Sequence, residues 1–154
     1  MRVFIGVDPG KRGAYAIMVT KYDDVADIET KPWDDQKFVD DMRQIVSDNG
    51  PDCVICTVEA VHSLPHEGVK SAFSFGKSCG YIEGVLRALQ IPYQTVIPQK
   101  WKKEWSLTND KKQSIETCKK LYPSLSLRAS ERCRTDSDGL AEAALIATWC
   151  KRHF

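Results

Sequence analysis

The sequence predicts an α/β fold built on a mixed β-sheet. Three strand-like segments follow one another at the N-terminus, and helical patterns then alternate with short β-branched runs. Consecutive strands pair antiparallel and strands joined through helices pair parallel, so we expect five strands in one mixed sheet with helices on both faces. The 154 residues, 42% of them hydrophobic, suffice for a single domain over residues 1–154.

The N-terminal elements are predicted from the alternation of apolar and polar residues and from the Gly and Pro residues that interrupt it. An apolar run ends at the turn "PGKRG" and a second apolar run follows, which predicts a hairpin, and the next segment alternates well enough for a third strand. The following helix has apolar residues on one face, an acidic first turn and a Gly-Pro pair after its end, and a short β-branched run then predicts a buried strand. The ranges are strands 2–8, 14–20 and 23–30, helix 34–50 and strand 52–60.

The C-terminal elements are a long helix, a short strand and two further helices. The stretch 98–110 is expected to be a loop, and it is the one connection long enough to suspect of function. Glycines spaced four apart give the long helix a face that another backbone can approach closely. The ranges are helix 68–90, strand 92–97 and helices 109–123 and 136–152, and the glycines are Gly76, Gly80 and Gly84.

The six cysteines are scattered, and the N-terminus reads at once as a strand and not as a secretory leader. We therefore expect reduced thiols and a cytoplasmic protein. Cys53 and Cys56 form a C-x-x-C pair, but the pair lies in an apolar strand pattern, so we interpret both as small core residues and not as a redox or zinc site. No apolar run approaches the roughly 18 residues that would cross a membrane.

The formal net charge of +1 hides an asymmetry along the chain. Residues 21–52 hold four Lys/Arg against ten Asp/Glu, whereas residues 99–134 hold ten against four. A basic third in a nearly neutral chain is compatible with a polyanion that docks on one surface. Two solvated faces of opposite charge are the alternative.

Four carboxylates stand at the ends of predicted elements: Asp8 and Glu59 end strands, and Asp136 and Asp138 open the last helix. Each has an ordinary explanation as a turn, strand-end or helix-capping residue. If the first and fourth strands are neighbours, however, all four can meet at one edge of the sheet. Clustered acids repel one another unless cations occupy the site, and hard oxygen ligands suit Mg²⁺ or Mn²⁺.

The motifs "FIGVDPGKRGAYAI", "TVEAV" and "DSDGLAEAALIA" resemble the RuvC family of Holliday junction resolvases, within the ribonuclease H-like superfamily. They occur in the family's order over nearly the whole chain. "PQKWKK" and "DGLAEA" resemble the short, phage-borne RuvC-like endonucleases. The resemblance implies a ribonuclease H-like fold and a metal-dependent endonuclease that resolves four-way junctions, and possibly other branched DNA, by paired nicks. It also implies 5′-phosphate and 3′-hydroxyl products, and host-cell cytoplasm as the location of a phage-encoded chain.

The resemblance also assigns site residues. Asp8, Glu59 and Asp138 match three family acids that bind two Mg²⁺ ions, for which Mn²⁺ is expected to substitute. The fourth family acid falls on Thr135, so Asp136 is the candidate for that role. Two phosphate-binding lysines fall on Lys102, with Lys103 as its rival, and on Lys111. Trp101 and Trp105 interleave with lysines, which predicts a phosphate-gripping loop with aromatic anchors. The expected DNA-binding residues are Lys100, Lys102, Lys103, Lys111, Lys112 and His62, the last at the position of a wedge-like aromatic in the cellular enzyme.

Other functions share parts of these motifs. Actin-like ATPases and sugar kinases open on a similar strand and glycine hairpin but need two such domains, so no nucleotide cofactor is expected. A nuclease of the same fold acting on forks or RNA–DNA hybrids and a non-catalytic module that binds branched DNA stay open. Because a four-way junction has two symmetric strands to cut, we expect a homodimer, with the glycine face of helix 68–90 as its interface or, alternatively, packed on the sheet.

Overall fold

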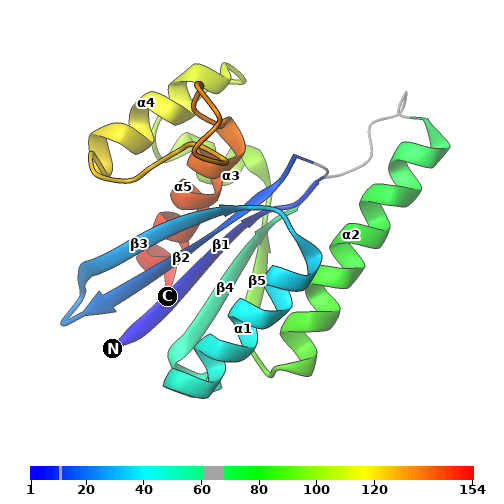
Figure 1. The fold of residues 1–154 in the computed structure, drawn as a ribbon, viewed down its shortest axis with the longest axis vertical. Helices are drawn as coiled ribbons and strands as arrows, with labels where there is room; N and C mark the ends of the chain where they lie inside the picture. Colours follow the sequence, from blue (N-terminus) through cyan, green and yellow to red (C-terminus); the bar gives the residue numbers. More distant parts are fainter. Residues whose placement is uncertain (11, 61–67) are drawn as a thin grey trace.

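The computed structural model describes residues 1–10, 12–60 and 68–154, which form a five-stranded sheet with helices on both faces (Figure 1). The strand order is β3-β2-β1-β4-β5, with β1 antiparallel to β2 and parallel to β4. The predicted mixed sheet is confirmed. The elements are β1 (Arg2–Asp8), β2 (Ala14–Lys21), β3 (Asp24–Pro32), α1 (Asp35–Asn49), the 3₁₀ turn η1 (Pro51–Cys53), β4 (Val54–Glu59), α2 (Val69–Ala88), β5 (Tyr93–Val96), α3 (Pro98–Lys103), α4 (Lys111–Leu121) and α5 (Asp138–His153).

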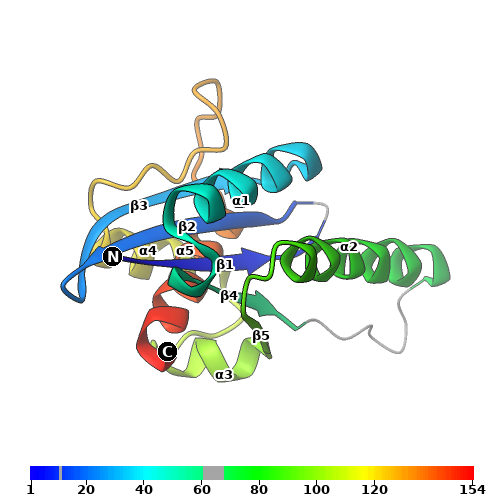
Figure 2. The ribbon, with the colours of Figure 1, turned by 90° about the horizontal axis from the view of Figure 1, so that it is seen from below.

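Alternation along the central strands divides the core between the two faces of the sheet. In β1, Val3, Ile5 and Val7 pack with α1 and α2, whereas Phe4 packs with α3, α4 and α5. Figures 1 and 2 show the two groups of helices on opposite sides. Asp8 has the parity of Phe4, so its side chain belongs to the face that α5 covers.

α5 crosses β1 at Gly6, where the two backbones nearly touch. A Cβ atom at Gly6 would lie 2.2 Å from the backbone nitrogen of Ala147 and 2.3 Å from the carbonyl oxygen of Ala143. The buried side of α5 is rich in alanine, which allows this close approach. The crossing fixes the start of α5 above the end of β1.

Two expectations change in detail. The predicted loop over 98–110 is wrong for its first part, because Pro98 at the first helical position starts α3. Cys56 is a buried core residue as predicted, but Cys53 belongs to η1 and is only half-buried. All six thiols are free. Among the described residues, no helix is long and apolar enough to cross a membrane.

The glycine face of α2 is not packed on the sheet. A Cβ atom at Gly76, Gly80 or Gly84 would meet nothing within 4 Å. α2 contacts the core through Ile82 and Leu86 on its other side. The alternative in which these glycines pack against the sheet is therefore wrong.

Candidate active site

Asp8 and Glu59 meet at one edge of the sheet. They end β1 and β4, which run parallel with Val7 opposite Val58, so the next residue of each strand is a neighbour of the other. Burial, followed by the nearby charges of Glu59 and other acids, raises the pKa of Asp8 well above its usual value. Glu59 is buried and Asp8 is half-buried, and the two carboxylates end neighbouring strands as the sequence predicted.

The first turn of α5 brings Asp138 to the same place. Ser137 caps this helix by accepting a hydrogen bond from the amide of Leu140 at 3.4 Å. A Cβ atom at Gly139 would lie 2.8 Å from the carbonyl oxygen of Arg12 and 3.5 Å from Oδ2 of Asp8. Gly139 thus lets the helix start lie against the β1–β2 turn, and the Asp138 charge contributes to the raised pKa of Asp8.

Glu142 is a fourth acid of the site that the sequence reasoning missed. It follows Asp138 by one helical turn, and its charge raises the pKa of both Asp8 and Glu59. Its carboxylate accepts a hydrogen bond from Ser114 of α4 at 3.2 Å. The spacing of Asp138 and Glu142 could have predicted this, because residues four apart on a helix share a face.

Two lysines hold carboxylates of this cluster. Nζ of Lys102 lies 3.1 Å from Oε1 of Glu142, and Nζ of Lys111 lies 2.6 Å from Oδ2 of Asp138. The hydrogen bond to Asp138 raises the pKa of Lys111. These are the two lysines that the sequence singled out, whereas Lys103 makes no ion pair with a described residue.

Asp136 lies outside this carboxylate cluster and has a different ionic partner. Its carboxylate forms an ion pair with Lys119 of α4, and it is not among the acids that raise the pKa of Asp8. Thr135, at the position of the family's fourth acid, is exposed. The structure thus brings Asp8, Glu59, Asp138 and Glu142 together and directs Asp136 to a basic helix beside them.

The remaining predicted DNA-binding residues spread away from this cluster. Lys100 of α3 lies over the ring of Trp149, 5.5 Å from its centroid, near the C-terminal end of α5. Lys103 lines a shallow groove with Lys102. Lys112 is exposed in the first turn of α4. His62 lies outside the described residues.

Three solved structures with this architecture are Holliday junction resolvases. RuvC of Thermus thermophilus in complex with a Holliday junction substrate superposes with a TM-score of 0.60 at 13% identity, over 96% of this chain and 90% of the other. The chain has the fold of the RuvC-type resolvases. A second Thermus thermophilus RuvC structure gives 0.52 at 13% identity, over 94% and 90% of the two chains. The yeast mitochondrial Holliday junction resolvase Ydc2 gives 0.53 at 15%, over 96% and 77%.

No family model and no curated protein matches the sequence. At these identities the likeness to the RuvC-type resolvases is one of fold. The case for a shared chemistry therefore depends on the residues of the carboxylate cluster.

The two tryptophans are not the aromatic anchors of a phosphate-gripping loop that the sequence predicted. Trp101 is fully buried, and its Nε1 donates a hydrogen bond to Oε1 of Glu59 at 2.9 Å. Trp105 packs partly buried against the same core cluster. Because both rings are turned inward, Trp101 orients Glu59 and does not stack on a ligand. Its hydrogen bond lowers the pKa of Glu59, while burial raises it more.

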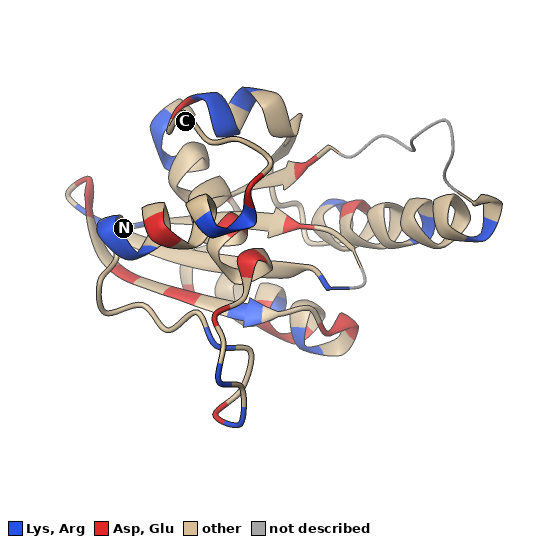
Figure 3. Cartoon of the chain, turned by 90° about the horizontal axis from the view of Figure 1, so that it is seen from above, with Lys and Arg blue, Asp and Glu red and all other residues tan. Residues whose placement is uncertain are grey.

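The donor set suits a divalent metal ion. Carboxylate oxygens are the ligands that Mg²⁺ takes in proteins, and the mutual repulsion of these acids favours a bound cation. Within residues 1–10, 12–60 and 68–154, no three acidic, histidine or cysteine side chains stand ready-made around one metal position. Lys102, Lys111 and Trp101 instead occupy oxygens of the cluster. Figure 3 shows the acidic strand ends in red beside the basic start of α4.

Proposed function

We propose that this protein is a RuvC-type, metal-dependent DNA endonuclease that resolves four-way junctions by paired nicks and leaves 5′-phosphate and 3′-hydroxyl ends. One observation carries the proposal: Asp8, Glu59 and Asp138 converge at one edge of a RuvC-like sheet, beside Lys102 and Lys111. The motifs "PQKWKK" and "DGLAEA" support placing the chain with the phage-borne members of that family.

Each residue has a chemical role in this proposal. Asp8, Glu59 and Asp138 would hold Mg²⁺ or Mn²⁺, with Asp136 as the candidate fourth ligand from the sequence. When bound, the divalent ions supply an activated water and offset charge on the reacting phosphate. Lys111 is 74% exposed and Lys102 lies deeper at 18%, so the two can grip a phosphate from outside and from within the site. Trp101 keeps the Glu59 carboxylate in place.

The test is cleavage of a substrate panel. The protein is incubated with a labelled four-way junction, a fork, a linear duplex and an RNA–DNA hybrid, with Mg²⁺, with Mn²⁺ and with neither. We expect symmetric paired nicks confined to the junction, and none without metal. Equal cutting of forks would indicate a nuclease that acts on branched DNA in general. Cutting of the hybrid would indicate a ribonuclease. Junction binding without any cutting would indicate a non-catalytic module.

We further propose that the active form is a C₂ homodimer joined through α2. Its glycine face is open and borders a largely apolar groove against α1, lined by Val39, Arg43, Gly80, Tyr81, Gly84, Val85, Ala88 and Leu89. Further along α2, Val69 and Phe73 are 86% and 75% exposed. Apolar surface of this kind favours a protein partner, and two symmetric strands of a junction need two active sites.

Gly84→Glu tests the dimer. The new side chain has open space, so the monomer is expected to fold normally, but a charge in the groove should prevent association. Analytical ultracentrifugation should show a monomer, and single nicks should replace paired ones. Gln44→Glu, on an exposed α1 position outside the groove, is the control and should leave the dimer intact. A dimeric Gly84→Glu protein would exclude this interface.

A further inference from the structure

The loop between α4 and α5 carries an arginine cluster that none of the assigned residues includes. Arg128, Arg132 and Arg134 lie within seven residues, and all three are exposed. Figure 2 shows this loop, in orange, projecting from the body beside β3. We propose that this arginine arm, residues 128–134, is a second contact to the DNA backbone, on the opposite side of the carboxylate cluster from α3. The inference rests on the proposed function and specifies how its substrate is held.

The arm is fixed at both ends to the active site. Leu127, just before it, is buried in the core cluster under α5. The carbonyl oxygen of Leu127 accepts a hydrogen bond from the amide of Ser137 at 2.8 Å, and Ser137 is the cap of α5. The amide of Cys133 donates to the carbonyl oxygen of Ser130 at 3.0 Å, which closes a turn at the tip. The position of the arm relative to Asp138 is therefore set by the backbone.

The charges of the arm are available to a ligand. Lys102, Lys111 and Lys119 are each paired with an acid, so their charges are largely offset inside the protein. None of the three arm arginines forms an ion pair with a residue that the structure describes. The arm thus adds unpaired positive charge that this edge can offer a polyanion, beside that of Arg12, Lys103 and Lys112.

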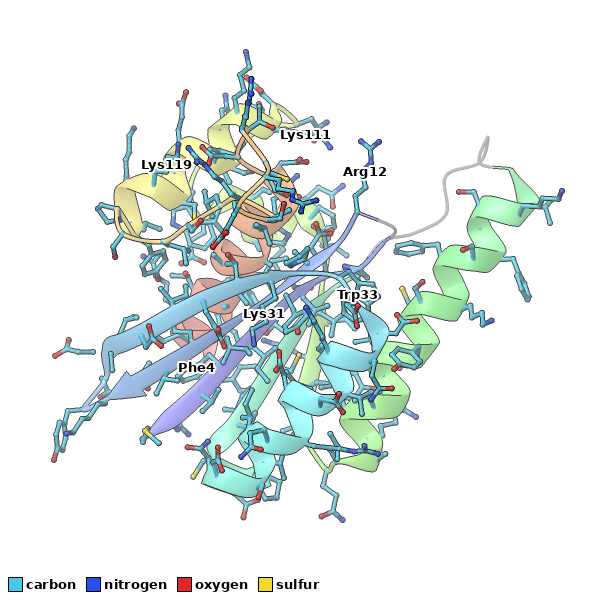
Figure 4. All side chains as sticks on the ribbon, in the orientation of Figure 1. Phe4, Arg12, Lys31, Trp33, Lys111 and Lys119 are labelled. Atoms are coloured by element: carbon cyan, nitrogen blue, oxygen red, sulfur yellow. The ribbon has the colours of Figure 1, made fainter. Side chains whose placement is uncertain are left out.

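The arrangement fits a duplex arm of DNA lying across the start of α5. Figure 3 shows the basic stretches of the loop at the bottom of the view and the basic start of α4 above them, closer to the strand ends. In Figure 4, Arg12 points outward near this edge, whereas Lys111 is paired with Asp138. Guanidinium groups pair with phosphate in a bidentate geometry, and such contacts position DNA without reading its sequence.

Removal of the three arm charges tests the inference. Binding of Arg128→Gln/Arg132→Gln/Arg134→Gln to a labelled four-way junction is measured by fluorescence anisotropy in EDTA, over a series of salt concentrations. Each lost phosphate contact lowers the slope of log affinity against log salt by about 0.9, so the slope should fall by up to about 3. Affinity at low salt should drop at least tenfold. The triple Arg→Lys variant should recover most of the slope.

The control variant, Arg2→Gln/Lys21→Gln/Arg87→Gln, removes three exposed cations that lie outside the basic third and away from the arm, and it should bind the junction as the unchanged protein does. The control variant should also cleave the junction at the rate of the unchanged protein, whereas the arm variant should need a higher junction concentration to reach half of its maximal cleavage rate. If the arm variant binds the junction with an unchanged salt slope, the arm does not contact the DNA backbone. The proposed function would not be affected by that result. Failure of the unchanged protein to bind a junction would refute both.

Discussion

Asp8→Asn is expected to reduce junction cleavage at least about 10³-fold, a loss of about 4 kcal/mol of transition-state stabilisation. Asparagine keeps the shape of the side chain but lacks the charge and one hard oxygen that a divalent ion needs. Junction binding should remain or tighten, because one negative charge facing the phosphate is gone. Cleavage of a labelled junction and anisotropy binding, both with Mg²⁺, measure the two effects separately.

Asp48→Asn is the matched control, since Asp48 is an exposed carboxylate of α1, on the face of the sheet that α5 does not cover. It should cut junctions at the normal rate. Undiminished nicking by the Asp8 variant would remove this carboxylate from the catalytic site.

The same substitution should stabilise the metal-free protein. Burial and neighbouring acids raise the pKa of Asp8, so the folded state holds this proton more tightly than the unfolded chain does. The stability that this proton provides is fully present below the unfolded pKa of about 4 and is lost as pH rises through the raised value. The asparagine side chain of the Asp8→Asn variant has no carboxyl group to ionise, so this loss of stability does not occur in it. In EDTA its unfolding temperature should exceed that of the unchanged protein at pH 8, and the difference should disappear below pH 4.

Much of this site follows from patterns that act over short distances. Alternation identified β1 and β4, and a carboxylate at each strand end was visible in the sequence. The two carboxylates meet only because β1 and β4 are parallel neighbours in the sheet. The sheet order is a property of the whole chain, so no local pattern fixes it.

The parts that the sequence did not predict depend on how helices are rotated about their axes. Glu142 joins the cluster because α5 presents one face to β1, and that rotation is set by the contact at Gly6. Trp101 looked like an exposed anchor among lysines, but α3 turns its ring inward onto Glu59. Asp136 precedes the capping residue Ser137, so it lies outside the helix and pairs with Lys119. Its role as a metal ligand stays a prediction.

Gly6→Ala is expected to destabilise the fold by about 3 kcal/mol or more, a large effect for one methyl group. The atoms that the new Cβ would meet belong to the backbone of α5, at 2.2 and 2.3 Å, so no side chain can move aside. α5 would have to shift away from β1. Chemical denaturation monitored by circular dichroism measures the loss.

Gly76→Ala is the matched control, because it adds the same methyl group to a helical glycine with nothing within 4 Å. It should stabilise α2 by up to about 1 kcal/mol through helix propensity. The shift of α5 in the Gly6 variant would also move Asp138 and Glu142 relative to Asp8, so cleavage should fall even at temperatures where the variant is folded. A Gly6→Ala protein with normal stability would show that α5 does not press on β1 at this point. The contact at Gly6 would then not be what positions Asp138 and Glu142 relative to Asp8.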